Sequence, residues 1–249
     1  IAPLIAETGG LNALFCDTTA LREQVVDDVI MSAFRSAGQR CSALRVLFLP
    51  HETADETVEM IKGAMEVLVL GDPADPATDV GPIIDAEARG LLDTHLTKMK
   101  GQAKFWQRDI GSLREKGTFF GPAILELESL SQIDKEVFGP ILHVIRYDPD
   151  DIEKVGGELS AKGYGLTLGV HSRLEGFAEK VKAAVRAGNV YVNRSIIGAV
   201  VGVQPFGGSG LSGTGPKAGG PHYLARFATE RTVTVNIAAQ GGDPTLLNL

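Results

Sequence analysis

The chain has 249 residues, a formal net charge of −7, and a composition of 44% hydrophobic and 22% charged residues. This balance predicts a soluble globular protein of one or two domains, and the acidic excess gives no reason to expect nucleic acid as a partner. The longest apolar runs, such as residues 196–203, are far shorter than the roughly 20 residues needed to cross a bilayer, so we expect no membrane-spanning segment.

The chain has only two cysteines, Cys16 and Cys41, and it shows no signal-peptide pattern. Both features favour a reducing, cytoplasmic compartment. The sequence opens at Ile1 with the pattern of an apolar strand that ends in a glycine turn, and we therefore expect a fragment of a longer protein.

Hydrophobic periodicity predicts alternating strands and helices along most of the chain. A helix that carries Val25, Val26 and Val29 on one face should be capped by Thr18 or Thr19 and end at Gly38. A second helix should open with a capping box formed by Thr53 and Glu56. The remaining predictions are strands at 11–17, 45–50, 166–172 and 189–193, a loop at 71–85, short extended pieces within 117–127, and helices at 86–100, 150–162 and 174–187.

This alternation predicts an α/β fold with a mostly parallel sheet flanked by helices. The β-branched run at 231–237 predicts an exposed strand near the C-terminus that could pair with another chain. No internal repeat or low-complexity tract is present.

A glycine-rich segment, GSGLSG at 208–213, matches the dinucleotide fingerprint letter for letter. We reject this interpretation because the fingerprint needs a strand directly before it and a helix opening at its third glycine. A phosphate-binding loop is also excluded, because Pro216 stands where that loop needs lysine. The segment is either a surface loop or a functional loop, since long loops inside compact domains are often functional.

Four short motifs lie in a fixed order along the chain: ETGG at 7–10, GQRCSA at 38–43, KEVFGP at 135–140 and QPFGGSGLSGTG at 204–215. Together they resemble the aldehyde dehydrogenase superfamily, over nearly the whole chain. The resemblance implies that Cys41 is the nucleophile that attacks an aldehyde. It also implies that oxidation leaves a thioester on Cys41 and that Glu7 activates the water that hydrolyses it. Residue type alone would instead favour a small core residue for Cys41 and a surface acid for Glu7.

The resemblance also implies an NAD cofactor, and it places Glu136, Phe138, Phe206 and Gly9 around the nicotinamide end. Glu136 would accept hydrogen bonds from the ribose hydroxyls, and Phe206 would form an aromatic wall. The alternatives are a surface acid for Glu136 and plain core packing for Phe206. No metal site is expected.

Longer matches around Cys41, residues 71–85 and residues 198–224 resemble one branch of the superfamily, the L-glutamate γ-semialdehyde (1-pyrroline-5-carboxylate) dehydrogenase module of bifunctional proline utilization proteins. In that branch Ser42, Gly198 and Ala199 would hold the substrate carboxylate, because small residues let backbone N–H groups converge on an anion. Phe34 either flanks the aliphatic part of the substrate or belongs to the core.

The same resemblance divides the chain into the end of a crossover from a separate cofactor domain (1–5), a catalytic domain (6–228) and a C-terminal strand with a tail (229–249). It implies a homo-oligomer and, in a bifunctional parent, a proline dehydrogenase domain. Two other hypotheses stay open: an enzyme for another small aldehyde, and a catalytically silent module kept for assembly.

Overall fold

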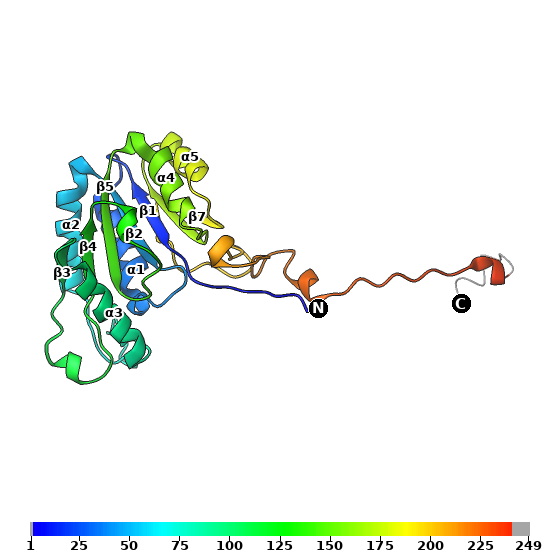
Figure 1. The fold of residues 1–249 in the computed structure, drawn as a ribbon, viewed down its shortest axis with the longest axis horizontal. Helices are drawn as coiled ribbons and strands as arrows, with labels where there is room; N and C mark the ends of the chain where they lie inside the picture. Colours follow the sequence, from blue (N-terminus) through cyan, green and yellow to red (C-terminus); the bar gives the residue numbers. More distant parts are fainter. Residues whose placement is uncertain (1, 241–249) are drawn as a thin grey trace.

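The computed structural model describes residues 2–240 and is built on one seven-stranded sheet with helices on both sides (Figure 1). The strand order is β3-β4-β5-β2-β1-β6-β7, and every neighbouring pair is parallel except β3 with β4. The strands are β1 (Asn12–Cys16), β2 (Leu44–Pro50), β3 (Lys104–Gln107), β4 (Ala123–Leu127), β5 (Ile141–Tyr147), β6 (Thr167–His171) and β7 (Asn189–Val192).

The predicted α/β fold with a mostly parallel sheet is therefore confirmed. The central strands β1 and β2 are buried along their whole length, as expected for strands covered on both faces. Their core includes the stacked rings of Phe15 and Phe48, with Tyr147 of β5 packed edge-on against both.

The α-helices are α1 (Arg22–Phe34), α2 (His51–Glu66), α3 (Ala86–Met99), α4 (Ile152–Ala161) and α5 (Glu175–Ala184). Helices α1 and α2 pack together, α4 packs on α5, and the α4–α5 pair lies across the sheet from α2 (Figure 1). Short 3₁₀ turns complete the chain: η1 (Arg35–Gly38), η2 (Gly111–Glu115), η3 (Leu130–Gln132), η4 (Pro149–Asp151), η5 (Gly210–Ser212), η6 (Leu224–Phe227) and η7 (Ile237–Gln240).

Two predicted helix caps are wrong. Helix α1 begins after Leu21 rather than at a threonine, because Thr19 instead hydrogen-bonds the side chain of Asp17. Helix α2 already begins at His51, which places Thr53 inside the first turn rather than at the N-cap. Asp85, by contrast, caps α3 with its side chain.

The carboxyl ends of β1 and β6 are closed by the chain's own polar side chains. Asp17 accepts hydrogen bonds from the hydroxyls of Thr19 (2.7 Å) and Ser172 (2.5 Å), and Asn193 accepts one from the Ser172 N–H. This is the point at which the strand order reverses direction, and α/β proteins commonly bind ligands there. In this chain the position is filled from within.

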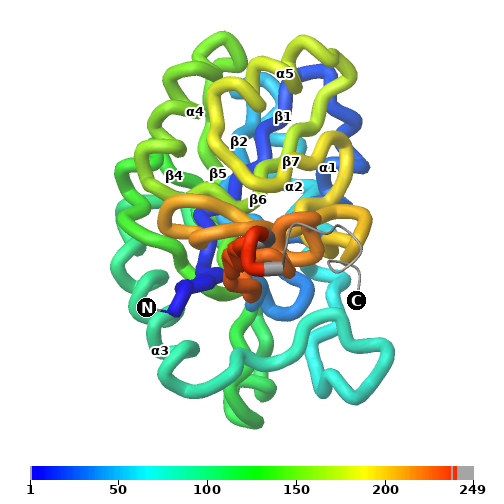
Figure 2. The backbone as a smooth tube through the Cα atoms, turned by 90° about the vertical axis from the view of Figure 1, so that its right-hand side faces the viewer, coloured from blue at the N-terminus to red at the C-terminus, as the bar shows by residue number. Residues whose placement is uncertain are grey.

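The segment after β7 returns to the opposite edge, where the parallel strands begin. It runs beside the N-terminal segment, and Glu7 forms an isolated bridge with Gly213 (Figure 2). Residues 2–5 form no strand, although Leu4 and Ala6 hydrogen-bond Thr214. The GSGLSG segment contains only η5 and opens no α-helix, which agrees with the rejection of the dinucleotide fingerprint.

The chain beyond η6 extends away from the sheet (Figure 1). Residues 231–236 are exposed and form no strand within the chain, so the predicted C-terminal strand is not formed here. Val233 and Val235 leave apolar surface open in this segment. Ile1 and the last residues of the predicted tail, 241–249, lie outside the described residues.

Candidate active site

The predicted functional residues lie in three segments that each lead into a strand. Glu7 to Gly10 precede β1, Cys41 and Ser42 precede β2, and Glu136 to Phe138 precede β5. These three strands are neighbours and run parallel, so their amino ends meet at one edge of the sheet. Residues separated by more than 100 positions in the sequence are thereby brought together.

The turn before Cys41 has an unusual backbone. Ser36, Ala37 and Gly38 all have positive φ angles, of 56°, 53° and 62°. Such conformations are costly for residues other than glycine, so the surrounding contacts must hold the turn in place. At Gly38 a side chain is doubly excluded, because a Cβ atom would also lie 2.3 Å from the carbonyl oxygen of Gly139.

Asn12, at the start of β1, holds the nucleophile segment from one side. Its buried amide donates to the carbonyl oxygens of Cys41 (2.7 Å) and Ala43 (2.9 Å), and its side-chain oxygen accepts from the Thr167 N–H (3.0 Å). The Thr167 hydroxyl in turn donates to the Ser42 carbonyl. Three consecutive carbonyl groups around the cysteine are therefore fixed by two side chains.

Cys41 faces an open pocket of about 640 Å³. The predicted substrate residues Ser42, Gly198 and Ala199 line this pocket together with Phe206. Within residues 2–240, the N–H groups of Gly198 and Ala199 meet no hydrogen-bond acceptor. Both donors are therefore available to a bound anion.

Glu7 lines a second, much smaller pocket of about 10 Å³, which Cys41 also lines. Cys41 and Phe206 line both pockets, so the thiol lies between the carboxylate side and the open side. The segment that carries Glu7 is held by backbone hydrogen bonds from Thr8 to Ser212 and from Thr214 to Ala6. The glycine-rich segment thus positions Glu7, and it is a part of the site.

The pKa of the Cys41 thiol is raised, first by burial and further by the carboxylates of Glu136 and Glu7, while the N–H groups of Ser42 and Cys41 partly offset this rise. The thiol is therefore protonated at neutral pH and needs a base, or a charge change nearby, to become a nucleophile.

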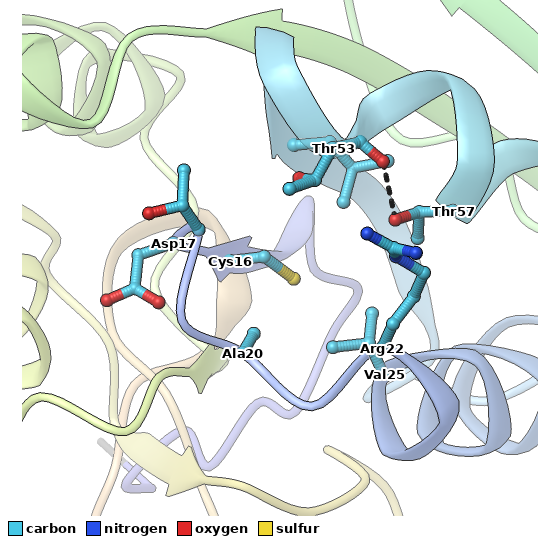
Figure 3. A pocket seen from close by; sticks show the side chains of 9 residues that line it. Cys16, Asp17, Ala20, Arg22, Val25, Thr53 and Thr57 are labelled. Carbon is cyan, nitrogen blue, oxygen red and sulfur yellow. Dashed lines mark hydrogen bonds between the residues drawn. The ribbon is translucent and has the colours of Figure 1, made fainter.

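The other cysteine, Cys16, is a core residue. It lies at the carboxyl end of β1, and its sulfur faces a pocket of about 30 Å³ between Asp17, Thr53 and Thr57 (Figure 3). Burial strongly raises its pKa, and the charge of Asp17 adds to this effect. Such a space holds about one water molecule, so Cys16 has no room for a substrate.

Glu136 is held by a buried arginine that the sequence analysis did not single out. Arg45 donates from Nε (3.1 Å) and Nη2 (3.0 Å) to Glu136 Oε1, and the Gly10 N–H donates to Oε2 (3.0 Å). A side chain at Gly9 would force the Glu136 carboxylate to move, because its Cβ would lie 1.7 Å from Oε2. Burial raises the pKa of Glu136, and Arg45 and the Gly10 N–H counteract it.

Phe138 and Phe34 have different surroundings. The Phe138 ring is 46% exposed and lies 5.0 Å from the Arg45 guanidinium carbon, so it is available to a ligand. Phe34 is 0% exposed, packs in the main hydrophobic core and does not line the pocket at Cys41. The core alternative for Phe34 therefore fits this structure, and the predicted contact with substrate does not.

Sequence reasoning missed Asn12 and Arg45. A polar residue within each of two apolar strand patterns, LNALFCD and LRVLFLP, is the signal that could have found them. Buried polar side chains must be hydrogen-bonded, and their partners here are backbone groups of the site and, for Arg45, also the Glu136 carboxylate.

Neither a cluster of metal ligands nor a membrane-spanning helix is found among the described residues. Residues 2–240 contain no group of three or more histidine, cysteine or acidic side chains that could hold a metal ion. In the same range, none of the helices is both long enough and apolar enough to span a bilayer.

A family model described as the aldehyde dehydrogenase family matches residues 1–233. The chain belongs to the aldehyde dehydrogenase family. It is 51% identical over 247 residues to the bifunctional protein PutA of Escherichia coli strain K12, in a match that covers 96% of this chain and 19% of PutA.

Two solved structures support this assignment to the aldehyde dehydrogenase family. A crystal structure of bifunctional proline utilization A has a TM-score of 0.91 and 59% identity, covering 96% of this chain and 24% of that one. A 1-pyrroline-5-carboxylate dehydrogenase from Thermus with bound NAD has a TM-score of 0.80 and 34% identity, covering 90% of this chain and 43% of that one. The chain thus spans about a fifth of the length of the PutA relative.

Proposed function

We propose that this chain carries the catalytic residues of an NAD-dependent dehydrogenase that oxidises L-glutamate γ-semialdehyde to glutamate. The observation that carries the proposal is that Cys41 shares one pocket with Ser42 and with the free N–H groups of Gly198 and Ala199. A nucleophile next to an anion site suits an aldehyde that also bears a carboxylate. The relatives named PutA and 1-pyrroline-5-carboxylate dehydrogenase support the same substrate.

In this proposal the Cys41 thiol releases its proton to water, and the thiolate then adds to the aldehyde carbon to form a tetrahedral adduct. The N–H groups of Cys41 and Ser42 lie close enough to the thiol to influence its pKa, and that of Cys41 is the proposed donor to the adduct oxyanion. Loss of hydride from the adduct leaves a thioester on Cys41. Glu7 then takes a proton from a water molecule, whose oxygen attacks the thioester carbon and releases the acid and the thiolate.

Bound NAD would supply the hydride acceptor that this oxidation needs. The residues fit its nicotinamide end: Glu136 Oε2 has acceptor capacity beyond the Gly10 N–H, and Gly9, which has no side chain, makes room for that oxygen. Phe138 and Phe206 would supply aromatic walls. Within residues 2–240 no glycine turn joins a strand to a helix N-terminus in the way that usually binds a pyrophosphate, so we assign the adenosine end to parts of the protein outside this chain.

The substrate carboxylate would be held by the Ser42 hydroxyl and the N–H groups of Gly198 and Ala199. Gly198 has a φ of 77°, a conformation that glycine adopts at little cost. Hydrogen bonds to a charged group contribute roughly 1.5–3 kcal/mol each, which is enough to favour a carboxylated aldehyde over a neutral one.

Two variants of the natural protein that contains this chain test the proposal. We expect Cys41→Ala to abolish aldehyde oxidation while NAD binding is retained. Glu7→Gln should still give a burst of about one equivalent of NADH per site, followed by slow turnover, because only hydrolysis of the thioester is impaired. Full turnover by Cys41→Ala would refute the mechanism, and loss of the burst in Glu7→Gln would assign Glu7 to an earlier step.

The relatives also suggest a wider setting. We propose that the natural protein is bifunctional, with a proline dehydrogenase domain that supplies the semialdehyde, and that it acts in the cytoplasm. We further propose that residues 229–236, which lie exposed beyond η6, take part in a homo-oligomer.

A further inference from the structure

Arg45 holds Glu136, but it also makes further hydrogen bonds to backbone groups of the site. Its side chain is fully buried, at 0% exposure, and Arg45 is the second residue of β2. Nη1 donates to the carbonyl oxygens of Gly38 (2.8 Å) and Gly139 (2.9 Å), and Nη2 donates to that of Arg40 (3.2 Å). With the two bonds to Glu136, all five guanidinium N–H groups have an acceptor.

These acceptors belong to two different parts of the site. Gly38 and Arg40 lie in the turn that leads to Cys41, and this turn contains three residues with positive φ. Glu136 and Gly139 lie in the segment that leads to β5. Since Nη1 bridges the carbonyls of Gly38 and Gly139, a single planar group fixes both turns relative to each other.

We propose that Arg45 is a positioning residue that sets the Cys41 turn and the Glu136 carboxylate in their relative places. It acts through these two groups and contacts neither substrate nor cofactor itself. Both oxygens of Glu136 are used: Arg45 takes Oε1, and the Gly10 N–H leaves Oε2 facing Gly9. The ring of Phe138 lies on the guanidinium, so its position also depends on Arg45.

The geometry explains why lysine cannot replace this arginine. An ammonium group has three donors that radiate from one atom, whereas here five donors lie in one plane and reach acceptors on both sides. Arg45→Lys keeps the charge but leaves some of the carbonyl groups without a donor. The strained turn before Cys41 then loses a support, and Glu136 can rotate.

The inference rests on the proposed function, and the test uses Arg45→Lys in the natural protein that contains this chain. We expect the KM for NAD to rise about 10-fold and kcat for the aldehyde to fall by a similar factor, as the loss of one or two charge-assisted hydrogen bonds implies. In a Glu136→Gln background the same change should raise the KM for NAD much less, because the partner through which Arg45 acts is already altered.

A second readout needs no aldehyde turnover. The N–H groups of Cys41 and Ser42 stabilise the thiolate, so a displaced turn should weaken that support. Alkylation of Cys41 by iodoacetamide at pH 8 should slow about threefold in Arg45→Lys, because a smaller fraction of the thiol is ionised.

The matched control is Arg146→Lys. Arg146 also bonds two carboxylates, with 2.7 Å from Nε to Glu126 and 2.6 Å from Nη2 to Asp55, but it lies near the carboxyl end of β5. This variant should leave the KM for NAD and the alkylation rate unchanged. Equal losses in both arginine variants, or normal kinetics and alkylation in Arg45→Lys, would overturn the positioning role.

If Arg45→Lys does not fold, Glu136→Asp tests the same link from the other side. The shorter side chain cannot reach both Arg45 and the Gly10 N–H, so alkylation of Cys41 should also slow. An unchanged alkylation rate would show that Glu136 and the Cys41 turn are independent and would overturn the inference. If the wild-type protein does not oxidise aldehydes, the proposed function fails, while the alkylation rates still decide the role of Arg45.

Discussion

The side-chain amide of Asn12 donates a hydrogen bond to the carbonyl oxygen of Cys41 at 2.7 Å, across a separation of 29 residues. The first residue of β1 therefore fixes the backbone of the proposed nucleophile. This contact makes the strand pairing of β1 with β2 a direct determinant of where the thiol lies.

Asn12→Asp should destabilise the fold. A carboxylate has nearly the same shape but would face the carbonyl oxygens of Cys41 and Ala43 without donors. We expect a loss of about 3 kcal/mol in the free energy of unfolding, measured by urea denaturation. The exposed Asn236→Asp is the control and should leave unfolding unchanged; equal stability of the two variants would contradict the role of Asn12.

The two cysteines should differ sharply in reactivity. Because the pKa of Cys41 is raised, its alkylation rate should keep increasing with pH beyond the pH at which an ordinary thiol is fully ionised. Cys16 is buried and should react only after unfolding. Mass spectrometry of the native chain treated with iodoacetamide should show one modified site, Cys41; modification of Cys16 at the same rate would contradict the structure.

Gly9→Ala should impair cofactor binding. The new methyl group would collide with Glu136 Oε2 and push this carboxylate out of place. We expect the KM for NAD to rise by roughly 10-fold, a loss of about 1.4 kcal/mol. At Gly63 in α2 an added methyl group would meet nothing within 4 Å, so Gly63→Ala should instead stabilise the helix by about 0.5–1 kcal/mol without kinetic effect.

Ser42→Ala should change substrate choice more than turnover of neutral aldehydes. If the hydroxyl holds the substrate carboxylate, kcat/KM for glutamate semialdehyde should fall by up to about 10- to 150-fold, as a charged hydrogen bond implies. Propanal has no carboxylate and should be oxidised at nearly the wild-type rate. Equal losses on both aldehydes would indicate damage to Cys41 instead.

His143 should make the fold sensitive to acid. Its ring is buried in β5, where Nδ1 donates to the Arg45 carbonyl (3.0 Å) and Nε2 accepts from His95 (2.9 Å). Burial lowers its pKa to about 3, and the charges of neighbouring His95 and Arg45 contribute. The folded state therefore binds fewer protons than the unfolded state between about pH 3 and 6.5, so stability is full above this window and falls as pH decreases through it.

The variant His143→Asn tests this sensitivity, since its amide can still donate to the Arg45 carbonyl. Between pH 7 and pH 4.5 the wild-type chain should lose about 2–3 kcal/mol more unfolding free energy than the variant does. Urea denaturation at the two pH values measures the difference. Identical acid sensitivity in the two proteins would mean that His143 is not the responsible group.

Much of the fold was predictable because continuous apolar runs mark β1 and β2, and apolar residues at helical spacing mark α2, α4 and α5. The central strand β5 was missed because His143 and Arg146 interrupt its apolar run. Edge strand β3 was missed because it is short and half-exposed. The Thr19 cap prediction failed because the N–H and hydroxyl of Thr19 both bond Asp17, and the Thr53 cap prediction failed because α2 already begins at His51.

The residues with recognisable motifs, such as Cys41 and Glu7, were found in sequence because each motif is local. The role of Arg45 is not local: its carboxylate partner lies 91 residues further along the chain. The sequence patterns of β2 and β5 do not indicate that the turns before these two strands will meet. Phe34 was misassigned for a different reason: it lies next to the Cys41 turn in sequence, yet its side chain is buried in the core.

The amino ends of β1, β2 and β5 carry the three segments of the site, and neighbouring strands in a sheet lie about 4.8 Å apart. Strand pairing therefore fixes the spacing of the points from which the carboxylate, the thiol and the cofactor-side acid extend, and the turns before the strands complete their placement. An insertion in a surface loop would leave this spacing intact, whereas a one-residue slip of β2 against either neighbour would move the sulfur by about 3.4 Å. The geometry of the proposed site therefore depends on the hydrogen-bond register of β2 with β1 and β5.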